Sequence, residues 1–180
     1  NDQSAGMQGF MSGQIKIEPT TDGKNFVVDL TGTFTIEMVG WSGYEKATAA
    51  HAAFSNEWKG MVRMLKCWNQ EKGKPIKPSF LIEVMALDLL RPPFGGNYPL
   101  EFMSFFASAA DRIDEIWPDP AGLGPAVSDS MDAASLVKAR TVLRQASDAV
   151  RAAINLGKGG MNGEALRAYR DLFGELFPLS

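Results

Sequence analysis

The sequence predicts an α+β protein that is mostly helical, in which a short β segment precedes a longer helical part. Three observations point to this class. Residues 13–39 are rich in β-branched and apolar side chains arranged in short runs, as in strands. After residue 44, apolar side chains recur with the 3.6-residue period of amphipathic helices. Clusters of Gly and Pro then divide the helical part into five predicted helices.

Three strands are expected in the β segment. The first contains Ile15 and Ile17, and the other two cover residues 26–30 and 33–39. Residues 20–23 read Thr-Thr-Asp-Gly, a composition typical of turns, and they separate the first strand from the second. Because three strands cannot form a sheet with two covered faces, we interpret them as the edge of a larger sheet.

Residues 40–44 contain two glycines and are expected to form a linker, so we divide the chain into residues 1–40 and residues 41–180. The first helix after the linker has an apolar stripe with helical spacing. Its members are Phe54, Trp58, Met61, Val62, Leu65 and Trp68. Gly73 and Pro75 end this helix.

Four further helices are expected. The second runs from residue 78 or 79 to residue 91 and is apolar on nearly all sides, so it should lie at the centre of the domain. The third covers residues 100–117, and the fourth continues to about residue 154. Candidate N-caps of the fourth helix are Ser128, Asp129 and Ser130. The last helix has Asn162 as its cap and carries Leu166, Tyr169, Phe173 and Leu176.

The composition excludes several classes of protein. The 180 residues are 45% hydrophobic with a net charge of −3, which argues against general affinity for nucleic acids. There is no run of 18 apolar residues for a membrane span, and no secretory leader is recognisable. With Cys67 as the only cysteine, neither an internal disulfide nor a Cys/His metal cluster can form. The simplest expectation is a cytoplasmic location without membrane partners.

Several familiar active sites can also be excluded. The sequence has no phosphate-binding GxxxxGK[ST] loop, no GxGxxG and no HExxH. The only histidine, His51, is expected in the exposed first turn of the first helix, which makes it a poor catalytic base. Cys67 is expected to be a small packed side chain rather than a nucleophile.

Positive charge is concentrated between Lys46 and Pro78, where seven basic residues accompany two acidic ones. This stretch either faces an anion or is a solvated helix face beside a lysine-rich loop. Within it, Lys66 borders the apolar stripe and could contact an anion or extend into solvent. Ser79 opens the second helix, where it could cap the helix or contribute to a phosphate site. In the β segment, Asp29 either lies at an exposed strand edge or binds a cation.

Two segments together carry Lys, Trp and Asn on one predicted helix and Ser at the start of the next. They are residues 61–69 (Met-Val-Arg-Met-Leu-Lys-Cys-Trp-Asn) and residues 77–84 (Lys-Pro-Ser-Phe-Leu-Ile-Glu-Val). This pattern resembles the helical half of oligoadenylate-synthetase-like and cyclic-GMP–AMP-synthase-like nucleotidyltransferases, especially the bacterial cyclic-oligonucleotide synthases of antiphage defence. Residues 119–129 resemble the loop that follows the core of these enzymes, and residues 165–178 resemble their C-terminal helix.

The resemblance implies that residues 1–40 are the end of a nucleotidyltransferase sheet and that residues 41–180 are the helical C-terminal domain. Asp29 would be the last catalytic carboxylate and a ligand of Mg²⁺ or Mn²⁺, although Thr-Gly-Thr follows Leu30 where the family has an apolar residue, Pro and Ala. Lys66 and Ser79 would contact the triphosphate of the substrate. The substrates would be nucleoside triphosphates, joined into a cyclic oligonucleotide second messenger.

The family also carries a Gly-Ser turn and an Asp-x-Asp pair on the first strands of its sheet, and this sequence contains neither. We therefore expect that an N-terminal catalytic segment is missing from this chain and is its required partner. We also expect this chain alone to be inactive, because two catalytic metal ions need more than one carboxylate. Two alternatives stay open. One is a stand-alone helical module for binding or assembly, and the other is an enzyme of the same superfamily that adds nucleotides to RNA ends.

Overall fold

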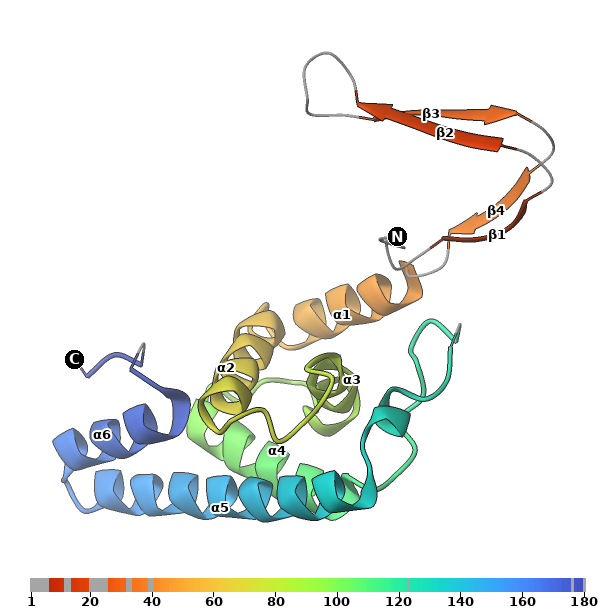
Figure 1. Cartoon of the computed structure of the whole chain (residues 1–180). Coiled ribbons are helices and arrows are strands. Elements are labelled where there is room, and N and C mark those ends of the chain that lie inside the picture. The colour runs from red at the N-terminus through yellow and green to blue at the C-terminus, as the bar shows by residue number, and fades with distance from the viewer. Residues whose placement is uncertain are drawn as a thin grey trace. The chain divides into compact units, whose positions relative to one another are not determined.

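A computed structural model describes residues 7–11, 14–19, 26–31, 34–38, 41–122, 124–175 and 177–179, with side chains from Lys46 onward (Figure 1). The chain divides into two compact units, Asn1–Tyr44 and Glu45–Ser180. The predicted roles of residues 1–40 and 41–180 stay predictions.

Within its described residues, the N-terminal unit contains four strands, which form two antiparallel pairs. They are β1 (Met7–Met11), β2 (Gln14–Pro19), β3 (Phe26–Thr31) and β4 (Phe34–Met38). β2 pairs with β3, and β1 pairs with β4. The prediction of three strands was wrong because β1 has no β-branched residue and a central glycine, and therefore carries little strand propensity.

The described part of the chain is mostly helical, as predicted, but it has six α-helices instead of five. The additional helix, α1 (Trp41–Ala53), begins within the expected linker and is rich in alanine, the best helix former. It ends at a turn in which Ser55 and Asn56 have positive φ angles of 53° and 62°. The apolar spacing continues across this turn, so the sequence pattern merged the end of one helix with the start of the next.

Three helices follow: α2 (Trp58–Glu71), α3 (Phe80–Leu89) and α4 (Tyr98–Arg112). Five members of the predicted stripe form the buried side of α2, and Asn69, which was not part of that prediction, is buried with them. The five are Trp58, Met61, Val62, Leu65 and Trp68. Six of the ten residues of α3 are buried, which confirms its central place. The Asn97 side chain caps α4 by accepting a hydrogen bond from the Leu100 N–H at 3.2 Å.

The long helix α5 (Ala133–Lys158) begins later than predicted. Its N-cap is Asp132, whose carboxylate accepts a hydrogen bond from the Ser135 N–H at 2.7 Å. The predicted caps at residues 128–130 were wrong, because these residues form the short 3₁₀ helix η1 (Val127–Ser130). There the Ser128 hydroxyl accepts a hydrogen bond from the Trp117 N–H at 3.0 Å, and so it holds the preceding loop.

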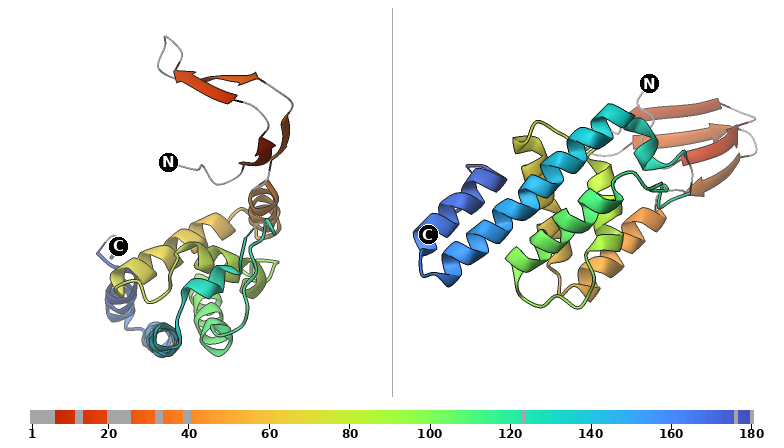
Figure 2. Two further views of the ribbon diagram at one scale, coloured as in Figure 1. Left: turned by 45° about the vertical axis from the view of Figure 1, so that its right-hand side comes forward. Right: turned by 90° about the horizontal axis from the view of Figure 1, so that it is seen from below.

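The last helix, α6 (Asn162–Phe173), starts with Asn162 as its first helical residue and has Met161 at the cap position without a side-chain bond. The prediction that Asn162 caps the helix was therefore wrong. Leu176, predicted to belong to this helix, lies outside the described residues. α5 packs along both α4 and α6 (Figure 2).

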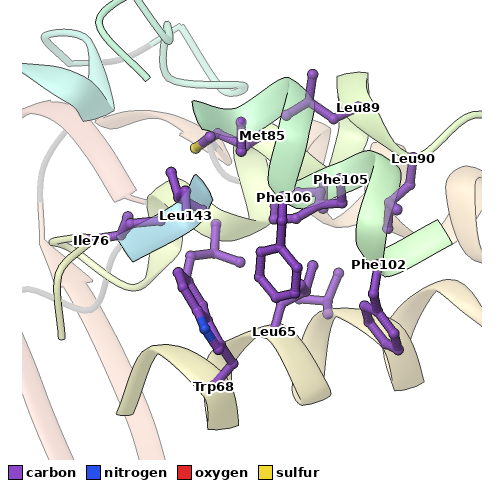
Figure 3. Close-up of a cluster of buried hydrophobic side chains, with 14 of the residues drawn as sticks. Leu65, Trp68, Ile76, Met85, Leu89, Leu90, Phe102, Phe105, Phe106 and Leu143 are labelled. Atoms are coloured by element: carbon purple, nitrogen blue, oxygen red, sulfur yellow. The ribbon is translucent and has the colours of Figure 1, made fainter. Parts of the chain in front are cut away.

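The core of the helical unit lies between α2, α3, α4 and α5 (Figure 3). The Trp68 ring on α2 faces Phe106 on α4, with 4.7 Å between the ring centroids. Met85 and Leu89 enter from α3, and Leu143 enters from α5. Burial of this apolar surface fixes α2 against α3, and it thereby positions the polar residues on their outer faces. Among the described residues, no helix has the length and apolar character needed to cross a bilayer.

Candidate functional site

Lys66 lies on α2 and forms an ion pair with Glu83 on α3. The two side chains are 36% and 31% exposed, so the pair lies at the surface where the two helices meet. Lys66 is at the edge of the buried stripe, as the sequence predicted, because Leu65 next to it is fully buried. Its partner Glu83 was not predicted, since only the packing of α2 on α3 brings the two residues together.

Ser79 occupies the N-cap position of α3 and is exposed. Its side chain makes no capping hydrogen bond, although its carbonyl accepts from the Ile82 N–H at 3.2 Å. The hydroxyl is therefore not used as an ordinary helix cap. Glu83 follows Ser79 by four residues, and residues at this spacing lie one turn apart on the same face of a helix. Ser79 therefore lies one helical turn before the ion-pair partner of Lys66.

Asn69 holds the loop that leads from α2 to Ser79. Its side chain is 2% exposed. The Asn69 amide donates to the Ile76 carbonyl at 3.0 Å and accepts from the Ile76 N–H at 3.0 Å. The Lys74 N–H also donates to the Asn69 carbonyl at 2.7 Å. The Asn in the Lys-Trp-Asn pattern therefore has a clear structural role, which is to fix the backbone before α3.

Phe80 follows Ser79 and is 40% exposed. An exposed aromatic ring beside a hydroxyl at a helix start offers a flat apolar surface next to a polar group. Such a surface can stack on a nucleotide base, because every base has a π-face. The sequence pattern alone did not identify Phe80, since a phenylalanine next to Leu81 and Ile82 reads as part of the core.

The basic residues between Lys46 and Pro78 have mixed roles. Lys46 and Lys72 donate to the carbonyls of Pro120 and Asp171, at 2.9 and 2.7 Å. Three others are exposed: Arg63, Lys74 and Lys77. Part of the positive charge therefore stabilises contacts within the helical unit, and part of it is open to solvent or to a ligand.

Two expectations about single residues were wrong. His51 lies in the last turn of α1, not in the first turn of a helix, and its Nδ1 atom accepts from the Lys59 N–H at 3.4 Å. Cys67 is exposed and not packed. It belongs to the outer side of α2, together with Arg63 and Gln70, because the buried stripe takes up the opposite side.

Asp29 lies on β3, in the other compact unit, and its Cα is paired in register with that of Lys16 on β2. Its predicted role as a metal ligand stays a prediction. Among the residues whose side chains are described, no group of three His, Cys, Asp or Glu residues is arranged to hold a metal ion. The helical unit carries the cationic residue Lys66 and the hydroxyl of Ser79, and the predicted carboxylate, Asp29, belongs to the other unit.

Comparison with known proteins gives one distant similarity of interest. No protein-family model matches the chain. A curated protein of Bacillus cereus (strain VD146), named a probable cyclic nucleotide synthase, is 27% identical to it over 138 residues. The match covers 74% of this chain, which spans 40% of the length of that relative. This similarity supports a distant relationship to a cyclic nucleotide synthase.

Proposed function

We propose that the chain is part of a nucleotidyltransferase that joins nucleoside triphosphates into a cyclic oligonucleotide, which acts as a second messenger in antiphage signalling. The observation that carries this proposal is the position of Ser79 one helical turn before Glu83, the ion-pair partner of Lys66, where α2 meets α3. The similarity to a probable cyclic nucleotide synthase supports the same class of reaction.

In this proposal the helical unit binds the triphosphate. The Lys66 ammonium supplies a point charge, and the Ser79 hydroxyl supplies a hydrogen-bond donor. Phe80 would stack on the base of the same nucleotide. These contacts bind and orient the nucleotide, so that its α-phosphate is held for attack by a hydroxyl of a second nucleotide. The bond to the β-phosphate breaks, pyrophosphate leaves, and the hydroxyl gives up its proton.

The proposed metal ion, Mg²⁺ or Mn²⁺, would be held in part by Asp29. A carboxylate is a suitable donor for either ion, but a single carboxylate cannot assemble a site for two ions. When bound, such ions lower the barrier to phosphoryl transfer by neutralising charge on the reacting oxygens. The donor set of this chain thus fits one ligand of such a site and not the whole of it.

The test is product formation from labelled ATP, GTP, CTP and UTP with Mg²⁺ or Mn²⁺. The complete protein encoded by the gene is expected to form a phosphatase-resistant cyclic product. The 180-residue chain alone is expected to form none, because its sequence lacks the Asp-x-Asp pair. Extension of a labelled RNA by the complete protein, without a cyclic product, would instead favour an enzyme that adds nucleotides to RNA ends. Absence of both activities would favour a binding or assembly module.

A further inference from the structure

Lys66 already has an anionic partner in the structure. The carboxylate of Glu83 forms an ion pair with its ammonium group, across the junction of α2 and α3. Any phosphate that uses Lys66 must therefore share this lysine with Glu83 or displace the carboxylate. This competition for Lys66 does not involve the Ser79 hydroxyl, because Glu83 lies one helical turn further along α3.

The exposure of the pair makes such an exchange feasible. About one third of each side chain is open to solvent, with 36% for Lys66 and 31% for Glu83. Exposed ion pairs are weak because water screens both charges. A group with several negative charges can compete with one carboxylate for the same ammonium, since the attraction scales with the charge.

We propose that Glu83 occupies the Lys66 ammonium at the first turn of α3 in the free protein and is exchanged for a phosphate group when a nucleotide binds. This inference rests on the proposed function, because it assumes that Lys66 meets a triphosphate. In the free protein, the Glu83 carboxylate is the anionic partner of the lysine. In the bound protein, the lysine contacts the phosphate and the carboxylate turns to solvent.

The exchange has a measurable consequence. The Glu83 charge competes for Lys66 and also repels an incoming polyphosphate, so removal of this charge should tighten polyphosphate binding. The expected gain is about two- to five-fold in Kd, the range that corresponds to an exposed ion pair. The gain should depend on Lys66, because without the lysine there is no pair to exchange.

The experiment measures binding of inorganic tripolyphosphate by calorimetry to the wild-type protein and to the variants Glu83→Gln, Lys66→Ala and Lys66→Ala/Glu83→Gln. Glu71→Gln is the control, because Glu71 is an exposed acidic residue near the end of α2. Glu83→Ala is measured in parallel, so that a folding defect in one variant does not decide the result. Circular dichroism melting shows that each variant is folded.

Three outcomes are decisive. Tighter binding by Glu83→Gln that is lost in the double variant, with Glu71→Gln unchanged, supports the exchange. Weaker binding by Lys66→Ala without a gain for either Glu83 variant overturns the exchange and leaves the proposed phosphate contact intact. No effect of Lys66→Ala overturns the phosphate contact itself and the exchange with it.

Discussion

The side-chain amide of Asn69 makes two hydrogen bonds with the backbone of Ile76, one as donor and one as acceptor, each 3.0 Å long. Both residues are buried, so these bonds are shielded from solvent. The loop between α2 and α3 is therefore fixed from the α2 side. Because this loop ends at Ser79, the amide of Asn69 also determines where α3 begins.

Asn69→Ala should destabilise the protein by about 2–3 kcal/mol, because it leaves the buried N–H and carbonyl of Ile76 without partners. Urea unfolding monitored by circular dichroism measures this difference. Gln70→Ala is the matched control, since Gln70 is the exposed amide next to Asn69 on the same helix. Equal stability of the two variants would show that the Asn69 amide is not needed to hold the loop.

Lys66→Ala should weaken the use of nucleotide by the complete protein while leaving the fold intact. A charge-assisted contact to phosphate contributes on the order of 2–3 kcal/mol, which corresponds to a loss of about 30- to 150-fold in kcat/KM. Lys138→Ala serves as control, because Lys138 is an exposed lysine on α5. Unchanged product formation by Lys66→Ala at limiting nucleotide would identify Lys66 as a solvated surface group.

Ser79→Ala is expected to have a smaller effect on kcat/KM than Lys66→Ala, because a neutral hydroxyl makes a weaker bond to phosphate than an ammonium does. Its melting temperature should equal that of the wild type, since the Ser79 side chain makes no capping hydrogen bond. Ser79→Thr, which keeps the hydroxyl, should restore nucleotide use. A lower melting temperature with unchanged kcat/KM would assign Ser79 to helix stability alone.

The pH dependence of stability should reveal the cap of α5. Hydrogen bonds from Ser135 hold the pKa of Asp132 below its ordinary value. The lowered pKa means that the carboxylate form favours folding, so this contribution is present at neutral pH and is lost as the pH falls below about 4. Asp132→Ala should therefore lower the melting temperature at pH 7 and have less effect at pH 3. Asp132→Asn keeps a capping oxygen without the charge, so its melting temperature at pH 7 should lie between those of the wild type and Asp132→Ala.

The helices of the core could be predicted from the sequence because large apolar residues carry the signal. Leu65 and Trp68 recur at helical spacing, and the structure buries both. The signal failed at α1, where small alanines replace large apolar residues and the stripe continues through the turn at Ser55 and Asn56. It also failed at the start of α5, where several residues with capping side chains precede the true cap, Asp132.

The candidate site could be predicted only one residue at a time. Lys66 was identified by its charge, and Ser79 by its position at a helix start. Both of these signals are local in the sequence. Glu83 could not be predicted as the partner of Lys66, because this pairing depends on how α2 packs against α3. The exposure of Phe80 depends on the same packing.

Asp29 gives the sharpest test of the proposed reaction. It follows Phe26, Val27 and Val28 on β3, whereas the competing carboxylates Glu18 and Glu37 lie on β2 and β4 without such an apolar run before them. Asp29→Asn preserves the shape of the side chain but removes the negative charge that a metal ion requires. In the complete protein, this change should abolish cyclic product while changing the melting temperature little.

The same variant should lose any stabilisation by Mn²⁺ that the complete protein shows, because a metal that binds only the folded state raises its stability. Product yield and thermal melting with and without Mn²⁺ measure both effects. Glu18→Gln and Glu37→Gln are the matched controls and should keep activity. If Asp29→Asn retains activity and one of these two variants loses it, the catalytic carboxylate lies on β2 or β4 instead of β3. The alignment of β3 with the family's metal-binding strand would then be wrong, while the phosphate contacts of Lys66 and Ser79 would remain open to their own tests.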